Sequence, residues 1–222
     1  MRSEIPPTSA SGESRSAIDW VDEGNDLYDR GQYAEAVICF DMAIKIDPGF
    51  PKAWYNKGVA LGKLGRHDLA LDCYDRTVEL RPDRPDVWNN HGAALGLLEM
   101  YDEALTSFDR AIDLDQKNAE AWNNKGAALG KLGRYDEAVD CLDRAIEQNP
   151  QYAEAFCNKG EALRRMDRYD QALACLDRAI ELDPGYAKAW YSRGLTFMAL
   201  GRSADADAAF SQAERLEAGE SR

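Results

Sequence analysis

The sequence predicts an all-α solenoid built from antiparallel helix pairs, and three observations lead to this fold class. One residue pattern recurs every 34 residues, and a fixed period of this length indicates a repeat architecture. Apolar residues within each repeat follow helical spacing. A proline also ends most repeats, where it stops a helix because proline cannot continue one.

Four positions of the pattern define the period. They are an aromatic position (Trp20, Trp54, Trp88, Trp122, Phe156, Trp190), a glycine (Gly24, Gly58, Gly92, Gly126, Gly160, Gly194), an alanine (Ala36, Ala70, Ala104, Ala138, Ala172, Ala206) and a proline (Pro48, Pro82, Pro150, Pro184). Six gapless repeats follow, at residues 17–50, 51–84, 85–118, 119–152, 153–186 and 187–220. They form one predicted repeat domain over residues 17–220. Residues 1–16 lack helical periodicity, so we expect a disordered tail there.

Each repeat is predicted to form two helices joined by a short turn. In the fourth repeat the first helix is expected over residues 119–132 and ends at the turn made by Gly133. The second helix is expected over residues 135–148, where Ala138 and Leu142 share one helical face. The other repeats follow the same scheme in order. Helices of this size are about 21 Å long, and such a pair cannot bury both of its faces alone, so neighbouring pairs must stack.

These positions at a 34-residue period make the chain resemble the tetratricopeptide repeat family over residues 17–220. The resemblance implies a right-handed superhelix in which the first helices line a concave groove and the second helices lie on the convex side. Two departures from the family pattern predict some local repacking. Thr77 replaces a small alanine of the second helix. The place before the glycine, usually leucine in the family, is basic: Lys57, His91, Lys125, Lys159 and Arg193.

Polar residues at both ends of the array occupy places where internal repeats carry packing residues. In the last second helix these residues are Asp207 and Glu214, and in the first helix of the first repeat they are Asp19 and Asp26. Terminal repeats need a polar outer face to stay soluble. The sequence therefore predicts an array that is capped at both ends.

Composition and charge argue against several classes of protein. The chain has 27 Lys and Arg against 40 Asp and Glu, a net charge of −13, which is the wrong sign for binding nucleic acid. No apolar run approaches the roughly 20 residues needed to span a bilayer, and the N-terminus lacks a signal-peptide core. We therefore expect a cytoplasmic protein with no nucleic-acid or membrane partner.

The sequence also offers little for catalysis. Only two histidines are present, and no phosphate-binding loop, nucleophile motif or paired metal motif occurs, so we expect no enzyme activity, no cofactor and no metal. Four of the five cysteines share one repeat position (Cys39, Cys73, Cys141, Cys175) and are interpreted as small buried hydrophobes. Cys157 is expected to face the groove, either as a reactive thiol or as a tolerated small residue.

The resemblance places ligand contacts at the second, fifth, sixth, ninth, twelfth and thirteenth residues of each repeat. At the sixth place four consecutive repeats carry asparagine: Asn56, Asn90, Asn124 and Asn158. An amide both donates and accepts hydrogen bonds, so this ladder suits the backbone of an extended peptide. The same amides could instead bond to a neighbouring helix, and the sequence leaves both interpretations open.

The other candidates for peptide binding at these places are Asn89, Asn123, Lys63, Lys131, Arg164 and Arg165. The ninth and twelfth places are small in the middle of the array, for example Ala127 and Gly130, whereas the fifth repeat has Glu161 and two arginines there. We expect an open, mildly apolar groove with a charged wall, where Arg164 and Arg165 recognise a carboxylate. The two-carboxylate clamp of chaperone-binding family members is matched at only two of its five places, Asn158 and Lys188, so a chaperone tail is not the expected ligand.

Together these features predict a non-catalytic scaffold that binds an extended peptide segment of a partner protein. Two alternatives remain open. The chain could be a structural unit that associates with itself through its groove or its ends, or a regulatory subunit of a separate enzyme.

Overall fold

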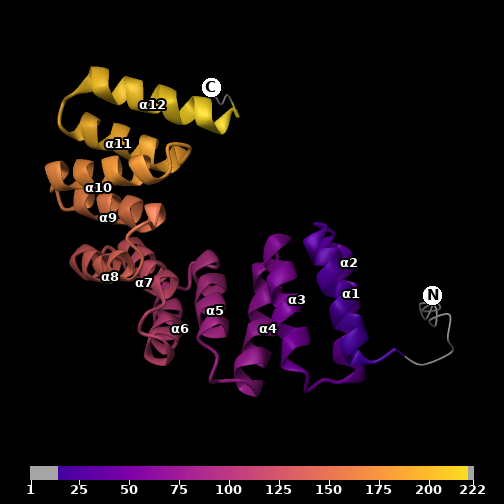
Figure 1. Ribbon diagram of the computed structural model, residues 1–222. Coiled ribbons are helices and arrows are strands. Elements are labelled where there is room, and N and C mark those ends of the chain that lie inside the picture. The colour runs from indigo at the N-terminus through magenta and orange to yellow at the C-terminus, as the bar shows by residue number, and fades with distance from the viewer. Residues whose placement is uncertain (1–14, 220–222) are drawn as a thin grey trace. The chain divides into compact units, whose positions relative to one another are not determined.

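The computed structural model describes residues 15–219, and in this part of the chain helices alternate with short turns (Figure 1). The helices are α1 (Ala17–Asp29), α2 (Tyr33–Ile46), α3 (Pro51–Lys63), α4 (His67–Leu80), α5 (Pro85–Leu97), α6 (Tyr101–Leu114), α7 (Ala119–Lys131), α8 (Tyr135–Gln148), α9 (Ala153–Arg165), α10 (Tyr169–Leu182), α11 (Ala187–Ala199) and α12 (Ser203–Glu217). Each predicted repeat contains two of them, so the all-α class and the helix pairs are confirmed. Most of the predicted tail lies outside the described residues.

The helices fall into two compact units, divided between Glu99 and Met100. The first unit contains α1 to α5 and the second contains α6 to α12. Within each unit, helices that follow one another in the chain pack side by side, for example α1 against α2 and α2 against α3. The division lies inside the third predicted repeat. A single six-repeat domain over residues 17–220 therefore stays a prediction.

In five of the six repeats, the repeated glycine of the first helix is a point of close contact with the second helix. A Cβ atom added at Gly24 would lie 2.5 Å from the Phe40 ring, and one at Gly126 would lie 2.6 Å from Leu142 Cγ. Phe40 and Leu142 are each only 1% exposed. The glycine is thus needed because it lets the large side chain of the second helix reach the backbone of the first.

The repeated tryptophan ties four of the first helices to the loop before each of them. Its indole N–H donates to the carbonyl oxygen six residues earlier: Trp54 to Pro48 (2.9 Å), Trp88 to Pro82 (3.0 Å), Trp122 to Gln116 (3.0 Å) and Trp190 to Pro184 (3.1 Å). A buried or half-buried indole needs such a partner. The tryptophans therefore have a structural role, in agreement with their helical register.

The basic residue before the glycine contacts an aspartate on the preceding second helix, as an ion pair for lysine and arginine and as a hydrogen bond for His91. The pairs are Lys57 with Asp41 (2.6 Å), His91 with Asp75 (2.9 Å), Lys125 with Asp109 (2.5 Å), Lys159 with Asp143, and Arg193 with Asp177 (2.6 Å). The apolar stem of such a side chain packs like leucine while its charged end reaches the carboxylate. This ladder of ion pairs is the physical reason for the first departure from the family pattern. At the second departure from the family pattern, the buried hydroxyl of Thr77 donates a hydrogen bond to the Cys73 carbonyl oxygen at 2.7 Å.

Turns inside the repeats pass through the left-handed region of backbone conformation. Glycine occupies this position in four of them: Gly31 (φ 77°), Gly65 (φ 71°), Gly133 (φ 76°) and Gly201 (φ 71°). In the third and fifth repeats Glu99 (φ 61°) and Asp167 (φ 57°) adopt the same conformation. A side chain there costs about 1–2 kcal/mol because Cβ approaches the following carbonyl oxygen.

Replacing Glu99 by glycine should therefore raise the free energy of unfolding by about 0.5–1 kcal/mol, after the extra backbone entropy of glycine is subtracted. Asp167→Gly should raise the free energy of unfolding by less, because the variant loses the hydrogen bond that Asp167 accepts from the Tyr169 hydroxyl. Urea denaturation of the two variants checks this, with Gly133→Ala as the opposite control that should lose stability. A Glu99→Gly protein less stable than wild type would contradict the claim that the backbone of Glu99 is strained.

The polar residues expected at the two ends are exposed in the structure. Asp207 and Glu214 on α12 reach solvent, whereas Val139 at an equivalent internal place is only 8% exposed. At the start of α1, Asp19 accepts a hydrogen bond from the Ser16 backbone N–H (2.8 Å), and the Ser16 hydroxyl oxygen accepts one from the Asp19 N–H. The Ser16 backbone N–H and then the Ser16 hydroxyl, which both donate to the Asp19 carboxylate, lower the pKa of Asp19.

We expect Asp207→Val combined with Glu214→Ile to make the protein associate with itself, because the change exposes a packing face of the kind that internal repeats bury. Light scattering over a range of concentrations measures the effect. The matched control, Asp207→Asn with Glu214→Gln, removes the same charges without adding apolar surface and should stay like wild type. If the double variant has the same mass as wild type at every concentration, Asp207 and Glu214 do not cap the C-terminal end of the array.

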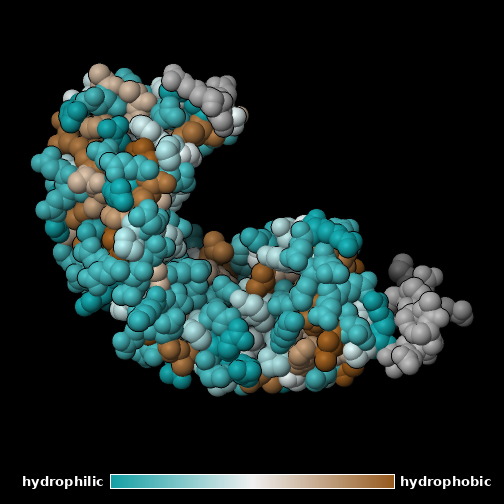
Figure 2. Space-filling model, viewed as in Figure 1, coloured by the Kyte–Doolittle hydropathy of each residue, from teal (hydrophilic) through white to brown (hydrophobic). Residues whose placement is uncertain are grey.

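Hydrophilic residues dominate the visible surface of each unit (Figure 2). No helix within residues 15–219 is both long and apolar enough to cross a bilayer. Across the same residues, no group of three or more His, Cys, Asp or Glu side chains is arranged to hold a metal ion.

Candidate functional site

First helices line a groove in each unit. In the first unit a groove of about 360 Å³ is bordered by Tyr28, Val59, Lys63, His67, Asn90 and Leu97, and we name it the apolar groove. In the second unit a groove of about 260 Å³ lies between α7, α9 and α11, with Tyr135 of α8 beside it. Ala127 and Gly130, which were expected in the mildly apolar part of the groove, border this second groove together with charged residues. A single groove with an apolar middle and a charged wall stays a prediction.

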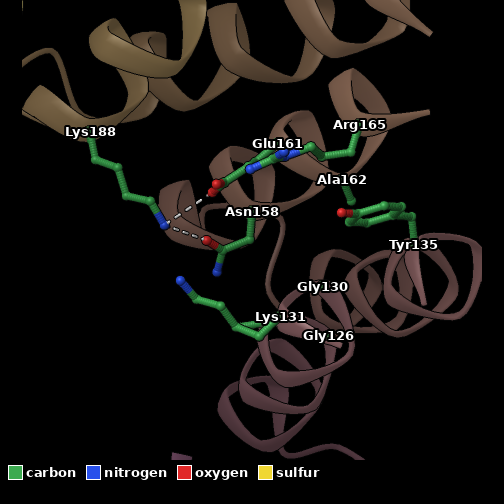
Figure 3. Close-up of a pocket in the computed structure, with 10 residues that line it drawn as sticks. Gly126, Gly130, Lys131, Tyr135, Asn158, Glu161, Ala162, Arg165 and Lys188 are labelled. Atoms are coloured by element: carbon green, nitrogen blue, oxygen red, sulfur yellow. Dashed lines mark hydrogen bonds and ion pairs between the residues drawn. The ribbon is translucent and has the colours of Figure 1, made fainter. Parts of the chain in front are cut away.

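The groove of the second unit has a floor of small residues and a rim of charged and polar ones, and we name it the cationic groove (Figure 3). The floor consists of Gly126, Ala127, Gly130 and Ala162. The rim consists of Lys131, Asn158, Glu161, Arg165 and Lys188. A Cβ atom added at Gly130 would meet nothing within 4 Å, so this glycine is not needed for packing and instead leaves the groove open.

Positive charge exceeds negative charge on the rim. Three basic side chains, Lys131, Arg165 and Lys188, face one acidic side chain, Glu161. The Lys188 ammonium lies 3.6 Å from the Glu161 carboxylate, and both side chains are close to half exposed. A pair this exposed contributes at most about 1 kcal/mol. Local charge is therefore positive, in a chain whose net charge is −13.

A chain of amides holds Lys188 in place. The Lys188 ammonium donates to Asn158 Oδ1 at 2.9 Å, and Asn158 Nδ2 donates to Asn123 Oδ1 at 2.9 Å. Asn123 is fully buried and directs its own Nδ2 toward the Tyr152 hydroxyl and Glu154 Oε1, both at 3.3 Å. Buried amides keep their positions when their partners are fixed in this way. These hydrogen bonds place the basic end of Lys188 at the mouth of the groove.

Three asparagines of the ladder make contacts between helices. Asn56 Nδ2 donates to Asn25 Oδ1 (2.6 Å), Asn90 Nδ2 donates to the Tyr55 hydroxyl (2.9 Å), and Asn158 donates to Asn123 as described above. Asn124 Oδ1 accepts from Asn123 Nδ2 (3.4 Å) on the same helix, α7. The bonds of Asn56, Asn90 and Asn158 are those expected if the ladder bonds to neighbouring helices. Direct pairing of the ladder with a ligand backbone stays a prediction.

The remaining candidates divide between the two grooves and the interior. Lys131 and Arg165 border the cationic groove, and Lys63 borders the apolar groove. Asn89 is only 3% exposed, so its side chain belongs to the interior. Arg164 does not border the cationic groove, and its buried Nε has no hydrogen-bond acceptor among the residues that the structure describes.

Three polar or charged groove residues were not among the expected site residues. Glu161 and Lys188 occupy the ninth and second places of their repeats, which the resemblance had already marked as contact places. Tyr135 begins α8 and lies outside those places. Its signal in the sequence is that tyrosine starts four of the second helices, at Tyr33, Tyr101, Tyr135 and Tyr169.

Cysteine 157 does not face the groove. Cys157 is 0% exposed, and burial raises its pKa to about 11. A thiol in this state is protonated at neutral pH and unreactive. The interpretation of Cys157 as a reactive surface thiol was therefore wrong, and the small-residue interpretation agrees with its burial. All five cysteines are free.

Sequence comparison identifies the class of protein. Tetratricopeptide repeat models match residues 51–84, 119–152, 153–186 and 175–208, and a TPR repeat model matches residues 24–65 and 97–133. The first three stretches have the same limits as the second, fourth and fifth predicted repeats. The matches together cover more than half of the chain, which belongs to the tetratricopeptide repeat family. The comparison with curated proteins gave no match.

Solved structures of the same fold include several family members. YrrB, described as a TPR protein with an unusual peptide-binding site, is 26% identical with a TM-score of 0.67, over 80% of this chain and 92% of YrrB. MamA is also 26% identical, with a TM-score of 0.63 over 73% of this chain and 95% of MamA. PilF of Pseudomonas aeruginosa, 18% identical with a TM-score of 0.75 over 91% of this chain and 92% of its own, shows the fold alone. Tetratricopeptide repeat proteins are generally non-catalytic, and the family and these neighbours support a protein-interaction scaffold.

Proposed function

We propose that this chain is a non-catalytic interaction scaffold that binds an extended peptide segment of a partner protein in its cationic groove. The observation that carries the proposal is the open floor at Gly130, beside polar and charged donors on three helices. Family contact places supply almost all of these residues. The peptide-binding site of YrrB gives further support, because YrrB is 26% identical to this chain and has the same fold. A cytoplasmic location stays a prediction.

The small floor allows a peptide backbone to approach closely. Side chains at Ala127 and Ala162 offer only methyl groups, and Gly130 offers none, so an extended chain can lie against α7 and α9. Lysine ammonium groups have three donors and can bond to peptide carbonyl oxygens from the rim. Asn124 and Asn158 stay candidates for pairing with peptide N–H groups, as do Asn56 and Asn90 in the first unit.

The apolar groove of the first unit would take an apolar side chain of the same or another partner segment. Val59 and Leu97 border it, and Leu97 is 63% exposed, so burying it on binding is favourable. Lys63 and His67 at its border supply polar contacts. This groove lacks the excess of basic residues found in the second unit and does not carry the proposal.

Filling the groove tests the proposed function. Gly130→Tyr places a large neutral side chain on the floor, and Tyr28 occupies the equivalent place in the first repeat, so the helix tolerates it. A library of random twelve-residue peptides is selected on the wild-type protein, and binding of the selected peptides is then measured on the variants. We expect Gly130→Tyr to lose binding and Gly130→Ala to keep it.

The outcome separates the proposal from its alternatives. Peptides that bind wild type and Gly130→Tyr equally would show that the groove is not the binding site. A wild-type protein that selects no peptide, and whose mass rises with concentration, would point to self-association instead.

A further inference from the structure

We propose that a groove between the second helices α2 and α4 of the first unit docks an amphipathic helix of a partner protein. This groove has a volume of about 530 Å³ and is bordered by residues of α2, α3 and α4, and we name it the second-helix groove. Its apolar lining residues include Val37 of α2, Trp54 and Leu61 of α3, and Leu69 of α4. The inference does not rest on the proposed function, because it concerns a separate site.

The second-helix groove lies on the other side of α3 from the apolar groove. Trp54, Lys57 and Leu61 border the second-helix groove and recur at helical spacing, so they share one face of α3. Val59 and Lys63 border the apolar groove and lie on the opposite face of the same helix. A ligand in the second-helix groove therefore does not compete with one that the first helices bind.

The side chain of Leu69 distinguishes this groove from the corresponding surface of the other repeats. The equivalent residues of the other repeats are all polar: Glu35, Glu103, Glu137, Gln171 and Asp205. Leu69 is half-buried and packs, with Val37 and Trp54, against the buried cluster that contains Leu61 and Cys73. Apolar surface that stays accessible to solvent in this way is typical of an interaction site.

The same replacement leaves Arg66 without a carboxylate. In the fourth repeat, Arg134 Nε and Nη2 donate to the two carboxylate oxygens of Glu137 at 2.7 Å and 2.6 Å. Arg66 is the equivalent of Arg134, and Leu69 takes the place of the glutamate. The Arg66 side chain is exposed and forms no ion pair within residues 15–219. Its guanidinium group is therefore available to a carboxylate of a partner.

An acidic side chain at the border of the groove is also available. Lys57 already pairs with Asp41 at 2.6 Å, and Arg76 pairs with an acid of its own helix. Asp72 is exposed and forms no ion pair in the described part of the chain. Charge complementarity thus calls for a partner segment with an acidic residue to face Arg66 and a basic residue to face Asp72.

The apolar lining favours a helix over an extended peptide. Each backbone N–H and C=O group that leaves water needs a hydrogen-bond partner, and the side chains of Val37, Leu61 and Leu69 offer none. A helix pairs these groups internally and presents only its side chains to the groove. A row of apolar residues three and four positions apart on such a helix fits between two helices, as ridges fit into grooves.

Selection of helical peptides tests the proposal. A library of helix-forming peptides of about twenty residues, long enough to be helical in isolation, is randomised along one face and selected on the full-length wild-type protein. Peptides that also bind Leu69→Glu are removed. Glutamate occupies the equivalent place in three other repeats, so this variant should fold. We expect the remaining peptides to carry apolar residues three or four positions apart with an acidic residue beside them. A selection that leaves no peptide, or only peptides without this pattern, would overturn the proposal.

Reversal of the charge at Arg66 tests the polar contact. Arg66→Glu should weaken binding of the remaining peptides about tenfold or more, and replacing the acidic residue of the peptide by lysine should restore it. The matched control, Arg134→Glu, makes the same change at the equivalent place of the fourth repeat and should leave the affinity at the wild-type level. Equal affinity for wild type and Arg66→Glu, or no recovery with the lysine peptide, would overturn the inference.

The fourth repeat allows a test by gain of binding. Of the ten residues that border the second-helix groove, eight are identical 68 positions later, and the two differences are Leu105 for Val37 and Glu137 for Leu69. Glu137→Leu should therefore create a second site and raise the number of helices bound per chain from about one to about two in isothermal titration calorimetry. An unchanged stoichiometry would contradict the role given to Leu69.

The variant that fills the cationic groove separates this site from the proposed function. The selected helices should bind Gly130→Tyr as tightly as wild type, because Gly130 belongs to the other unit. Loss of helix binding in Gly130→Tyr would show that these helices occupy the cationic groove and would overturn the inference. Failure of the extended peptides in the earlier test would leave the second-helix groove unaffected.

Discussion

Gly126→Ala should destabilise the second unit by about 1–3 kcal/mol, whereas Gly130→Ala, one helical turn later on α7, should stabilise it by about 0.5–1 kcal/mol. The opposite signs follow from the surroundings of the added methyl group. At Gly126 it would lie 2.6 Å from Leu142 Cγ and 3.2 Å from the Ala138 carbonyl oxygen, in a region where Leu142 is 1% exposed. At Gly130 it meets nothing within 4 Å.

Both variants have the same gain in helix propensity, so the difference between them isolates the packing cost. Urea denaturation followed by circular dichroism measures both free energies of unfolding. Gly160→Ala serves as a second case, since its added Cβ would lie 2.6 Å from Leu176 Cγ. Equal stability changes at Gly126 and Gly130 would mean that the glycine pattern has no packing origin.

Asn123→Asp should lower the free energy of unfolding by about 3 kcal/mol or more at neutral pH, which is the cost of leaving a buried charge uncompensated. Asn123 is fully buried, and its Nδ2 lies 3.3 Å from Glu154 Oε1. The substitution replaces this donor with a second carboxylate and removes the donor to the Tyr152 hydroxyl.

The deficit should depend on pH in a defined direction. Burial and Glu154 would raise the pKa of the new carboxyl in the folded state above its unfolded value. The folded variant then binds more protons than the unfolded one, so its stability rises relative to wild type as the pH falls below neutrality. Asn149→Asp is the matched control, because Asn149 is exposed and its Oδ1 accepts from the Gln151 N–H, a role that Asp47 and Asp183 perform in other repeats.

A pH-independent deficit in Asn123→Asp would show that its cost is not electrostatic. A comparable deficit in Asn149→Asp would show that the substitution is costly wherever it is made. Either result would contradict the electrostatic cost assigned here to a charge at the Asn123 position.

The regular part of this fold was predictable because the same residue pattern occurs in six repeats, so each repeat supports the helix limits expected for the others. Helix α8 begins at Tyr135 and ends at Gln148, as expected, and α7 ends at Lys131, one residue before the expected end. Buried glycines and alanines repeat with the same period, so six copies of one pattern specify the helix pairs. The turn at Glu99 was not predictable, because the conformation that glycine adopts in other repeats is imposed there on a glutamate.

The candidate site was predictable only in part. The contact places of the family located Lys131 and Arg165 at the groove, because each lies on a fixed face of a first helix. Adjacent residues on a helix point in different directions, so Arg164 borders a different region although it was expected to act with Arg165. The hydrogen bond between Asn123 and Asn158 joins residues 35 positions apart. The sequence does not show that these two amides bond to each other, because the bond depends on the packing of α7 against α9.

The location of a bound peptide is the most direct test of the central claim that the cationic groove is the binding site. A peptide selected on the wild-type protein is mixed with the full-length chain carrying labelled methyl groups, and intermolecular nuclear Overhauser effects are recorded. We predict contacts from the peptide to the methyl groups of Ala127 and Ala162 on the groove floor. Contacts only to Ile146 and Leu173, on the second helices α8 and α10, would contradict the account.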